Sequence, residues 1–441
     1  MKSTKLTYIT VLIVALAPLA VGDAVTDWNA NAGVAATAAC ISPDGDPFHE
    51  SRIYAMMHVA IHDALNAIDR RSRPYALDLQ AEAGSSPDAA VAAAARDVLV
   101  PLIAQLPLEL VTQACIDASV ASVEAAYTAA LAAIPPNGQA KAQGIAVGQA
   151  AAAAILALRA EDGAVGPFLN FACPQDTNPG EYQCTPGTPF IAFEVWENVI
   201  PFAMKNSSQF RPGPPYAVRG KKYTADFNEV KSLGGDDVTT PSARTADQTE
   251  IALFWLESSP LKWNRIARTV SADQGLDLWK NARLFGLLNL ALADGYIAMA
   301  DSKNHYNYWR PVTAIQTGDT DGNPDTSGDP AWTPLRPTPP DQDYDSGHSI
   351  EGGAGAEVLK QFFGTDEISF QDCGALLPAG STCSDASPVF RSYTSFSQAA
   401  AENASSRTLI GFHFRKSVTK GTKHGRKIGK RAANLYLRPV H

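Results

Sequence analysis

Charged residues are scarce in this chain of 441 residues, and their balance is negative. Asp, Glu, Lys and Arg make up 18% of the residues, and the formal net charge is −9 at pH 7. An acidic chain is not expected to bind nucleic acid non-specifically, so any anion site must be a local basic pocket. Hydrophobic residues make up 45% of the chain, which is enough for a globular protein with a sizeable core.

Strand-like alternation is also scarce, and the sequence shows no internal repeat. Helical spacing of apolar residues predicts an all-α fold, a helical bundle with long loops. We expect irregular structure from the leader to about residue 48 and in the Pro/Gly-rich section 161–243. The predicted helices cover residues 50–70, 88–105, 110–133, 138–160, 246–258, 274–302, 349–363, 397–413 and 420–436.

After the N-terminus, no apolar run predicts a transmembrane helix. Residues 1–22 carry Lys2 and Lys5, an apolar core interrupted by Pro18 and then small residues, which is typical of a cleaved export signal. We therefore expect an exported protein, periplasmic or secreted, with no integral membrane segment. We expect an N-terminal helical region (23–245) and a C-terminal helical core (246–441) that form one compact unit. The sequence leaves open whether the protein is a homo-oligomer.

Cysteine is rare, and no Cys-x-x-Cys motif occurs, so thiol redox chemistry is not expected. Six cysteines suit disulfides in an exported protein. Many pairings are open, and the simplest joins cysteines across two Pro/Gly-rich loops and leaves one long-range pair: Cys173–Cys184, Cys373–Cys383 and Cys40–Cys115.

Familiar metal motifs are incomplete. His58 and His62 are four residues apart, but the Glu of a His-Glu-x-x-His motif is missing, so we expect a core-facing pair bonded to Asp63 or a carbonyl. Residues 319–329 begin like a calcium loop, with Asp319, Asp321 and Asn323 at alternate positions. Pro324 replaces the required Gly and the final Glu is absent, which favours a solvated acidic turn over a nonstandard calcium loop.

Two cations stand close together in the segment "KNHYNYWRP" (303–311). Lys303 and Arg310 are seven residues apart, and about 100° per residue places them on nearly the same helical face. Pro311 is expected to end this helix. No carboxylate lies between the cations, so we expect them to face an anion from elsewhere.

Two later segments supply further groups for an anion. In "DYDSGHS" (343–349), Ser346, Gly347 and His348 precede a helix expected to start near Ser349, whose free N–H groups favour anions. In "SSRTLIGFHF" (405–414), Arg407 and His413 fall on one predicted helix, and the basic segment 420–429 adds positive potential. Three cations and two imidazoles suit a tetrahedral oxyanion with a nucleophile or ligand on one side and a general acid or base on the other.

These motifs, in this order, resemble the signature of the superfamily of type 2 phosphatidic acid phosphatases and vanadium-dependent haloperoxidases. They read Lys-x6-Arg-Pro, Ser-Gly-His and Ser-Arg-x5-His and cover about residues 303–425. The segment "AMMHVAIHDALNAI" (55–68) also looks like the N-terminal helix of bacterial haloperoxidase-like members, so the resemblance extends through most of the mature chain.

The resemblance implies a helical bundle and one site for two chemistries. In a phosphatase, His413 would attack phosphorus and His348 would protonate the leaving group. In a haloperoxidase, His413 would ligate vanadium, and His348 would bond the apical oxygen and assist the binding of peroxide. Vanadate, or phosphate in the same site, would be held by Lys303, Arg310, Ser346, Gly347 and Arg407. Five-coordinate vanadate resembles the transition state of phosphoryl transfer, which explains the shared site.

Two departures from the family pattern bear on the choice. Asp345 replaces the usual Pro before Ser-Gly-His, and it opposes anion binding unless it points away or pairs with a cation. Ser417 replaces the Asp that orients the nucleophilic histidine of the phosphatases.

The second departure favours a haloperoxidase that uses hydrogen peroxide to oxidise a halide, with bromide expected, and that acts on a small organic acceptor. A phosphatase and a non-catalytic phosphate binder are the alternatives. Residues near the motifs are candidates for tuning the halide preference: His305, Trp309, Asp341 and Tyr344.

Overall fold

The computed structural model describes residues 22–43, 45–136, 138–174, 177–374 and 389–440. It confirms the all-α prediction, since helices dominate and the strands in these ranges form two short antiparallel pairs. The first pair joins β1 (Leu169–Asn170) to β2 (Ile191–Ala192), and the second joins β3 (Phe370–Gly374) to β4 (Val389–Tyr393). The expected export signal falls almost wholly outside the described residues.

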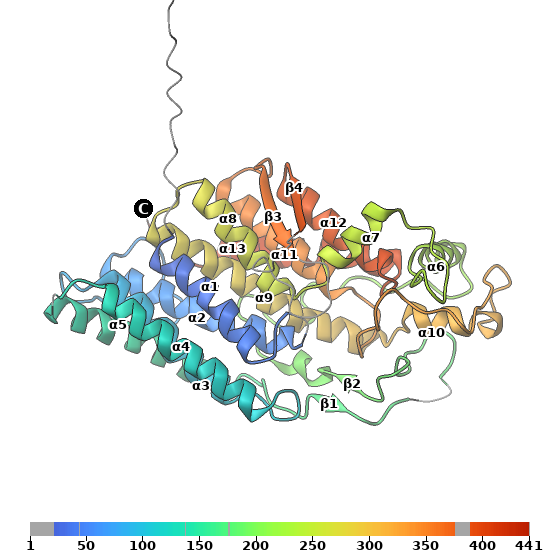
Figure 1. Cartoon of the computed structure of the whole chain (residues 1–441), viewed down its shortest axis with the longest axis horizontal. Coiled ribbons are helices and arrows are strands. Elements are labelled where there is room, and N and C mark those ends of the chain that lie inside the picture. The colour runs from blue at the N-terminus through green and yellow to red at the C-terminus, as the bar shows by residue number, and fades with distance from the viewer. Residues whose placement is uncertain (1–21, 44, 137, 175–176, 375–388, 441) are drawn as a thin grey trace, which may run out of the picture.

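The helices lie in two groups on either side of a long central helix (Figure 1). The N-terminal group is α1 (Ala24–Ala38), α2 (Pro47–Ile68), α3 (Pro87–Ala104), α4 (Gln113–Ala133) and α5 (Gly138–Leu158). The C-terminal group is α8 (Ser259–Asp273), α11 (Gly347–Phe363), α12 (Phe396–Leu409) and α13 (Arg415–Leu435). The central helix α9 (Leu278–Tyr306) packs against both α2 and α11, so one core serves both groups.

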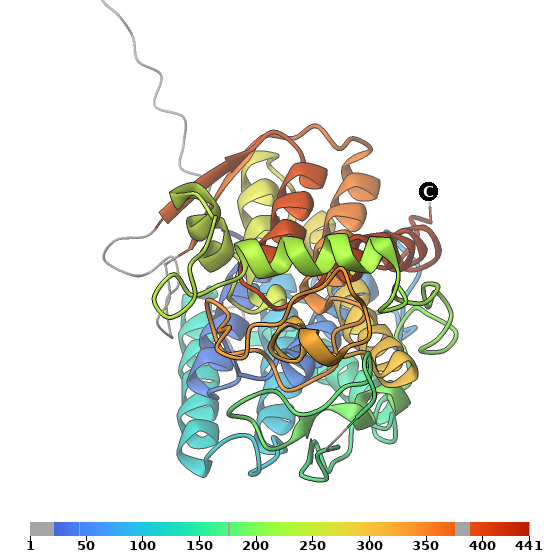
Figure 2. The same cartoon turned by 90° about the vertical axis from the view of Figure 1, so that its right-hand side faces the viewer.

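Short helices and loops close one end of the bundle, which faces the viewer in Figure 2. They include α6 (Lys221–Leu233), α7 (Ala246–Phe254), α10 (Pro311–Gln316) and the 3₁₀ turns η1 (Glu194–Asn198) and η2 (Gly318–Thr320). The loop from α10 to α11 lies at this end and leads into Ser346. Loops carried by a rigid bundle are common places for binding residues.

Two helices are long and apolar enough to cross a membrane by length and composition alone, α5 and α9. The prediction that no such segment follows the N-terminus is therefore wrong at the level of composition. The apolar window of α9 is wholly buried inside the protein, because this helix is the centre of the core.

Glycine on α13 brings this helix against the start of α11. Gly421, Gly425 and Gly429 recur every fourth residue and share one face. A Cβ atom at Gly425 would lie 1.8 Å from the carbonyl oxygen of Ile350, so only glycine allows this approach. The backbone of Gly421 likewise lies close to the carbonyl of Ser346.

The basic side chains of α13 occupy its opposite, solvent-facing side. Lys423, Arg426, Lys427 and Lys430 are exposed. The segment 420–429 thus packs on α11 through its glycines and carries its charges toward solvent, and the positive potential that it would add at the anion site stays a prediction.

Several elements were not expected from the sequence. The stretch after residue 23 was predicted to be irregular, but Asp23 and Thr26 form a capping box that starts α1, and Trp28 is buried. The helices α6 and α8 and both strand pairs were also missed. α8 starts after Ser258 with Pro260 in its first turn, and its burial by neighbouring helices outweighs a weak local pattern.

Two of the expected disulfides are present. Cys40–Cys115 ties the end of α1 to the start of α4, and Cys173–Cys184 closes a loop. The third expected pair cannot be followed, because Cys383 lies outside the described residues.

The histidine pair on α2 is buried, as predicted. His62 Nδ1 lies 2.9 Å from Asp63 Oδ1, whereas His58 Nε2 lies 2.7 Å from Asn29 Nδ2 on α1. Their partners differ, so the two rings do not converge on a common ligand.

The acidic turn after α10 is not solvated at its centre, contrary to the prediction. Asp321 and Asn323 are buried. The carboxylate of Asp321 accepts hydrogen bonds from the backbone N–H of Asn323 (2.7 Å) and the hydroxyl of Thr326 (2.9 Å). Asp321 therefore closes its own turn, as Asp side chains commonly do.

Candidate anion site

Lys303 and Arg310 come from two different helices, which corrects the prediction that they share one helical face. α9 ends at Tyr306, and Asn307 takes a left-handed conformation (φ 44°) that turns the chain. Arg310 caps the start of α10, and Pro311 opens that helix. Proline fits this position because the N–H that it lacks would have no helical partner there.

Both cations are buried and meet at Asp341 in the loop before α11. The Nζ atom of Lys303 lies 3.5 Å from Asp341 Oδ2 and also donates to the carbonyl of Gln342. The guanidinium of Arg310 pairs with Asp341 Oδ1, and its Nε donates to the Asp341 carbonyl at 2.7 Å. Burial lowers the pKa of Lys303 to about 8, against the opposing effect of Asp341.

The segment Ser346-Gly347-His348 starts α11, two residues earlier than predicted. Ser346 is fully buried, and its Oγ accepts a hydrogen bond of 2.9 Å from the hydroxyl of Ser349. A Cβ atom at Gly347 would lie 2.3 Å from the sulfur of Met299, so a larger residue there would need the Met299 side chain to move. The N–H groups in this first turn have no partner within the helix and can face an anion.

His348 is held as a neutral imidazole. Its Nε2 lies 3.3 Å from the carbonyl oxygen of Glu257, between α7 and α8, and its own carbonyl accepts from the side chain of Asn403 on α12. Burial, followed by the charge of Arg407, lowers the pKa of His348 well below its usual value. A neutral imidazole can accept a proton, as a general base must.

Arg407 and His413 do not share a helix, contrary to the prediction. α12 ends at Leu409, Gly411 turns the chain with φ 89°, and His413 lies in the connection to α13. Arg407 is buried and donates to the Trp255 carbonyl at 3.1 Å.

Not every N–H group of the Arg407 guanidinium has a hydrogen-bond partner among the described residues. Its Nε is a buried donor with no partner among the described residues. Burial, and then the charge of Arg310, lower the pKa of Arg407 to about 9. A buried donor of this kind is suited to an oxyanion.

His413 lies between a cation and a carboxylate. Arg310 approaches the ring with its NH1 2.9 Å from Nε2, and Asp343 Oδ1 lies 2.9 Å from Nδ1. A guanidinium only donates, so this geometry favours the neutral tautomer with the proton on Nδ1 and a lone pair on Nε2. Burial, then the charges of Arg310 and Lys303, lower the pKa of His413 well below its usual value.

The carboxylate partner of His413 was not expected from the sequence. Asp343 is buried in the loop before α11, and its carbonyl accepts a 2.7 Å hydrogen bond from the Ser417 hydroxyl of α13. The backbone N–H of Phe414 adds a longer contact of 3.4 Å to its carboxylate. Burial raises the pKa of Asp343 to about 7. An orienting carboxylate is therefore present, although it does not follow His413 in the sequence.

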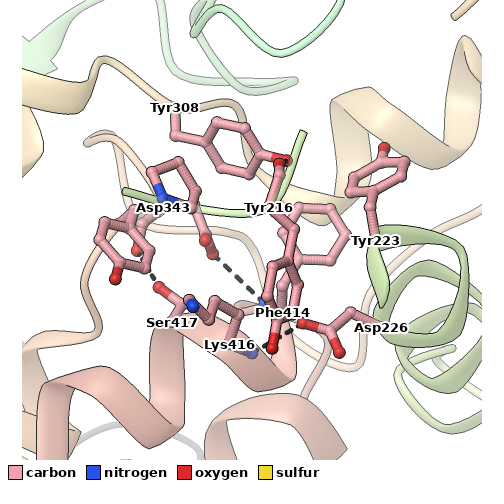
Figure 3. A pocket seen from close by; sticks show the side chains of 10 residues that line it. Tyr216, Tyr223, Asp226, Tyr308, Asp343, Phe414, Lys416 and Ser417 are labelled. Carbon is pink, nitrogen blue, oxygen red and sulfur yellow. Dashed lines mark hydrogen bonds between the residues drawn. The ribbon is translucent and has the colours of Figure 1, made fainter. Parts of the chain in front are cut away.

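Aromatic side chains lie beside Asp343 (Figure 3). They line a small cavity of about 10 Å³, roughly the room that one water molecule needs, and include Tyr216, Tyr223, Tyr308 and Phe414. The second carboxylate oxygen of Asp343 is buried without a protein partner among the described residues. The cavity and the unpaired oxygen together suit a buried water.

Asp345, the unusual residue before Ser346, pairs with a histidine and forms no ion pair with the cations. Its Oδ2 lies 3.1 Å from Nδ1 of His424 on α13, and both side chains are fully buried. The segment 341–345 thus carries three alternate Asp residues, and each has its own basic partner. Their alternate spacing was the sequence signal that could have pointed to this arrangement.

The proposed halide-tuning residues do not all lie at the site. His305 is exposed, and its Nδ1 lies 3.0 Å from Arg211 NH1. Trp309 and Tyr344 are buried, and the Tyr344 hydroxyl donates to the carbonyl of Gly213. Only Asp341 contacts the predicted site residues directly.

Comparison with known proteins agrees with this architecture. Residues 283–441 match the family model of the second helical-bundle domain of vanadium chloroperoxidase. Vanadium chloroperoxidase of Curvularia inaequalis is 26% identical over 187 residues, which span 36% of this chain and 30% of that protein.

Solved structures resemble nearly the whole chain. A bacterial vanadium-dependent iodoperoxidase superimposes with a TM-score of 0.76 and 23% identity, covering 95% of this chain and 98% of that one. A holo-type bacterial vanadium-dependent chloroperoxidase gives a TM-score of 0.67 and 16% identity over 88% of this chain and 91% of that one.

The class defined by the fold and the site is that of helical-bundle proteins with a buried basic cradle, formed here by Lys303, Arg310, Arg407 and His413. Within this class, the chain has the fold of the vanadium haloperoxidase structures, and residues 283–441 are similar to the second helical-bundle domain of vanadium chloroperoxidase.

Proposed function

We propose that this protein is an exported vanadium-dependent haloperoxidase that uses hydrogen peroxide to oxidise a halide. The observation that carries the proposal is the neutral His413, whose Nε2 lone pair faces buried cations while Asp343 holds Nδ1. Peroxide would be reduced to water while the halide, with bromide proposed, becomes a hypohalous acid, and one proton is consumed. A small organic acceptor would then be halogenated.

The residues present fit vanadate. Arg310 contacts the imidazole, and the charges of the three buried cations Arg310, Lys303 and Arg407 all act on His413. Arg407 offers its unpaired Nε, and the first turn of α11 offers free N–H groups. We assign the ligating nitrogen to His413 and the contacts with the vanadate oxygens to the residues of the three motifs, Lys303, Arg310, Ser346, Gly347 and Arg407. Bound vanadate would supply a Lewis acid that activates peroxide.

The remaining side chains position groups and move protons. Asp343 keeps the proton of His413 on Nδ1, so that Nε2 keeps its lone pair, which a bound ligand would take over from Arg310. His348 is neutral and can accept a proton from an incoming peroxide. The burial of the cradle excludes bulk water, which strengthens the attraction between its cations and an anion.

One observation favours a phosphatase as the second candidate. The pair of Asp343 and His413 supplies the orienting carboxylate that a nucleophilic histidine needs. Phosphate would then occupy the cradle and His413 would form a phosphohistidine. His348 is neutral in this structure, so it would have to take up a proton before it could protonate the leaving group. A site that binds phosphate without either reaction is the third outcome.

The three functions separate in one set of assays on the purified protein. With vanadate, peroxide and bromide, we expect halogenation of a phenolic dye, and we expect its loss in His413→Ala. His305→Ala is the matched control, because His305 is an exposed imidazole outside the cradle. Parallel reactions with iodide and chloride define the halide range. Hydrolysis of a phosphate ester, inhibited by vanadate, would instead support the phosphatase. Full vanadate occupancy without oxidation of any halide would contradict our proposal.

A further inference from the structure

We infer that the Asp341 carboxylate competes with a bound oxyanion for the cations of the cradle. This inference rests on the proposed function of the cradle. Its carboxylate pairs with two of the three cations assigned to the anion, Lys303 and Arg310. An oxyanion that binds to the same two cations must therefore share them with this carboxylate or displace it. Asp341 would thus determine how tightly the site holds vanadate or phosphate.

The position of Asp341 supports this role. Its side chain is 15% exposed, whereas those of Lys303 and Arg310 are 3% and 1% exposed. Asp341 is therefore the member of this group nearest to solvent. Despite burial, the charges of both cations hold the pKa of Asp341 below its usual value, so the carboxylate is ionised at neutral pH.

Neither cation depends on the Asp341 carboxylate for its placement. Lys303 also donates to the carbonyl of Gln342, and Arg310 donates to the carbonyls of Asp341 and Phe412, the latter at 2.9 Å. These backbone contacts remain when only the side-chain charge is removed. Replacing Asp341 by Asn should therefore leave the cations in place and make their charge available to the anion.

The other two Asp residues of the segment do not share this role. Asp343 pairs with His413 and Asp345 pairs with His424, and neither forms an ion pair with Lys303 or Arg310. Among the three, Asp341 is the one whose carboxylate forms ion pairs with the cations of the cradle. Removing one opposing charge from a buried site should raise anion affinity roughly ten- to a hundredfold.

The test measures binding of inorganic phosphate and of vanadate by calorimetry, without any turnover. We expect Asp341→Asn to bind both anions at least about tenfold more tightly than the wild type. Asp301→Asn is the matched control. It removes the same formal charge two residues from Lys303, but the Asp301 carboxylate pairs outward with Arg211, with Nε 2.7 Å from Oδ2. We expect its anion affinity to equal that of the wild type.

The outcomes distinguish the inference from the proposed function. Tighter binding by Asp341→Asn alone, including binding that appears only in this variant, supports the inference. Unchanged or weaker binding by Asp341→Asn, in a protein whose wild type binds anions through His413, overturns the inference and leaves the cradle intact. An equal gain in Asp301→Asn also overturns it, because the effect would then follow net charge. If no variant binds either anion, the cradle itself and the inference are both wrong.

Discussion

Removing the carboxylate of Asp343 should weaken vanadate binding without unfolding the protein. The side chain makes one short contact, 2.9 Å from Oδ1 to His413 Nδ1, and one long contact of 3.4 Å with the N–H of Phe414. The bond from the Ser417 hydroxyl goes to the backbone carbonyl of Asp343 and survives any side-chain change. Asp343→Ala therefore removes chiefly one hydrogen bond to His413, which is charge-assisted at a pH above the Asp343 pKa of about 7.

The size of the effect follows from that single bond. A hydrogen bond to a charged group contributes about 1.5–3 kcal/mol, which corresponds to roughly ten- to a hundredfold in affinity. The cavity of about 10 Å³ beside Asp343 would merge with the space that the carboxylate leaves. A water in that space could accept a hydrogen bond from the Nδ1–H group of His413 and replace part of the lost interaction. We therefore expect the vanadate affinity to fall by a factor nearer ten than a hundred.

Vanadate titration followed by calorimetry measures this loss, and thermal unfolding confirms that the variant is folded. Ser417→Ala is the matched control, because it removes the neighbouring hydrogen bond and keeps the carboxylate. We expect its affinity to fall by less than that of Asp343→Ala. If the folded Asp343→Ala variant binds vanadate as well as the wild type, Asp343 does not orient His413 and our reading of the pair is wrong.

Two further predictions concern the buried scaffold. Burial raises the pKa of Glu50 to about 8 in the folded protein, whereas Glu50 of the unfolded chain ionises near the ordinary pKa of 4.5. Between pH 4.5 and 8, the folded state therefore binds one proton that the unfolded state has lost. The contribution of Glu50 to stability should therefore fall as pH rises from about 4.5 to 8, by up to about 4 kcal/mol. Chemical denaturation of Glu50→Gln should show a flatter profile over this range, and a profile as steep as that of the wild type would refute the assignment. Gly425→Ala forces a Cβ atom against the Ile350 carbonyl and should cost about 1–3 kcal/mol or more. Gly138→Ala has open space around it and should leave the melting temperature unchanged or raise it, so equal losses in the two variants would argue against close packing of α11 and α13.

The sequence predicted the components of the site better than the path of the chain between them. Residue types and motif order were enough to select Lys303, Arg310 and His413, because oxyanion chemistry needs cations and an imidazole. Helical geometry was the wrong reason for the first two, since the chain turns at Asn307 and Arg310 starts a new helix. A left-handed residue such as Asn307 is set by tertiary contacts as well as local preference, so the pattern alone did not show the break.

The unpredicted elements share a physical cause. α1 has a capping box that the sequence displays, yet its Asn and Gly residues weaken the helical pattern, and burial of Trp28 supplies what local preference does not. The pairing of β3 with β4 likewise depends on contacts between residues far apart in the chain. Such contacts are invisible to a local reading of apolar spacing.

Ser417 shows most clearly how position in sequence differs from role in space. The absence of a carboxylate four residues after His413 favoured a haloperoxidase, because a phosphatase histidine needs an orienting acid. In the folded protein that acid comes from Asp343, and Ser417 holds the backbone of the same residue. Ser417 therefore preserves the orienting pair rather than marking its loss, and it cannot discriminate between phosphate and vanadate chemistry. The discrimination must come from what the cradle does with peroxide and halide, and its charge is set by Asp341 rather than by Ser417.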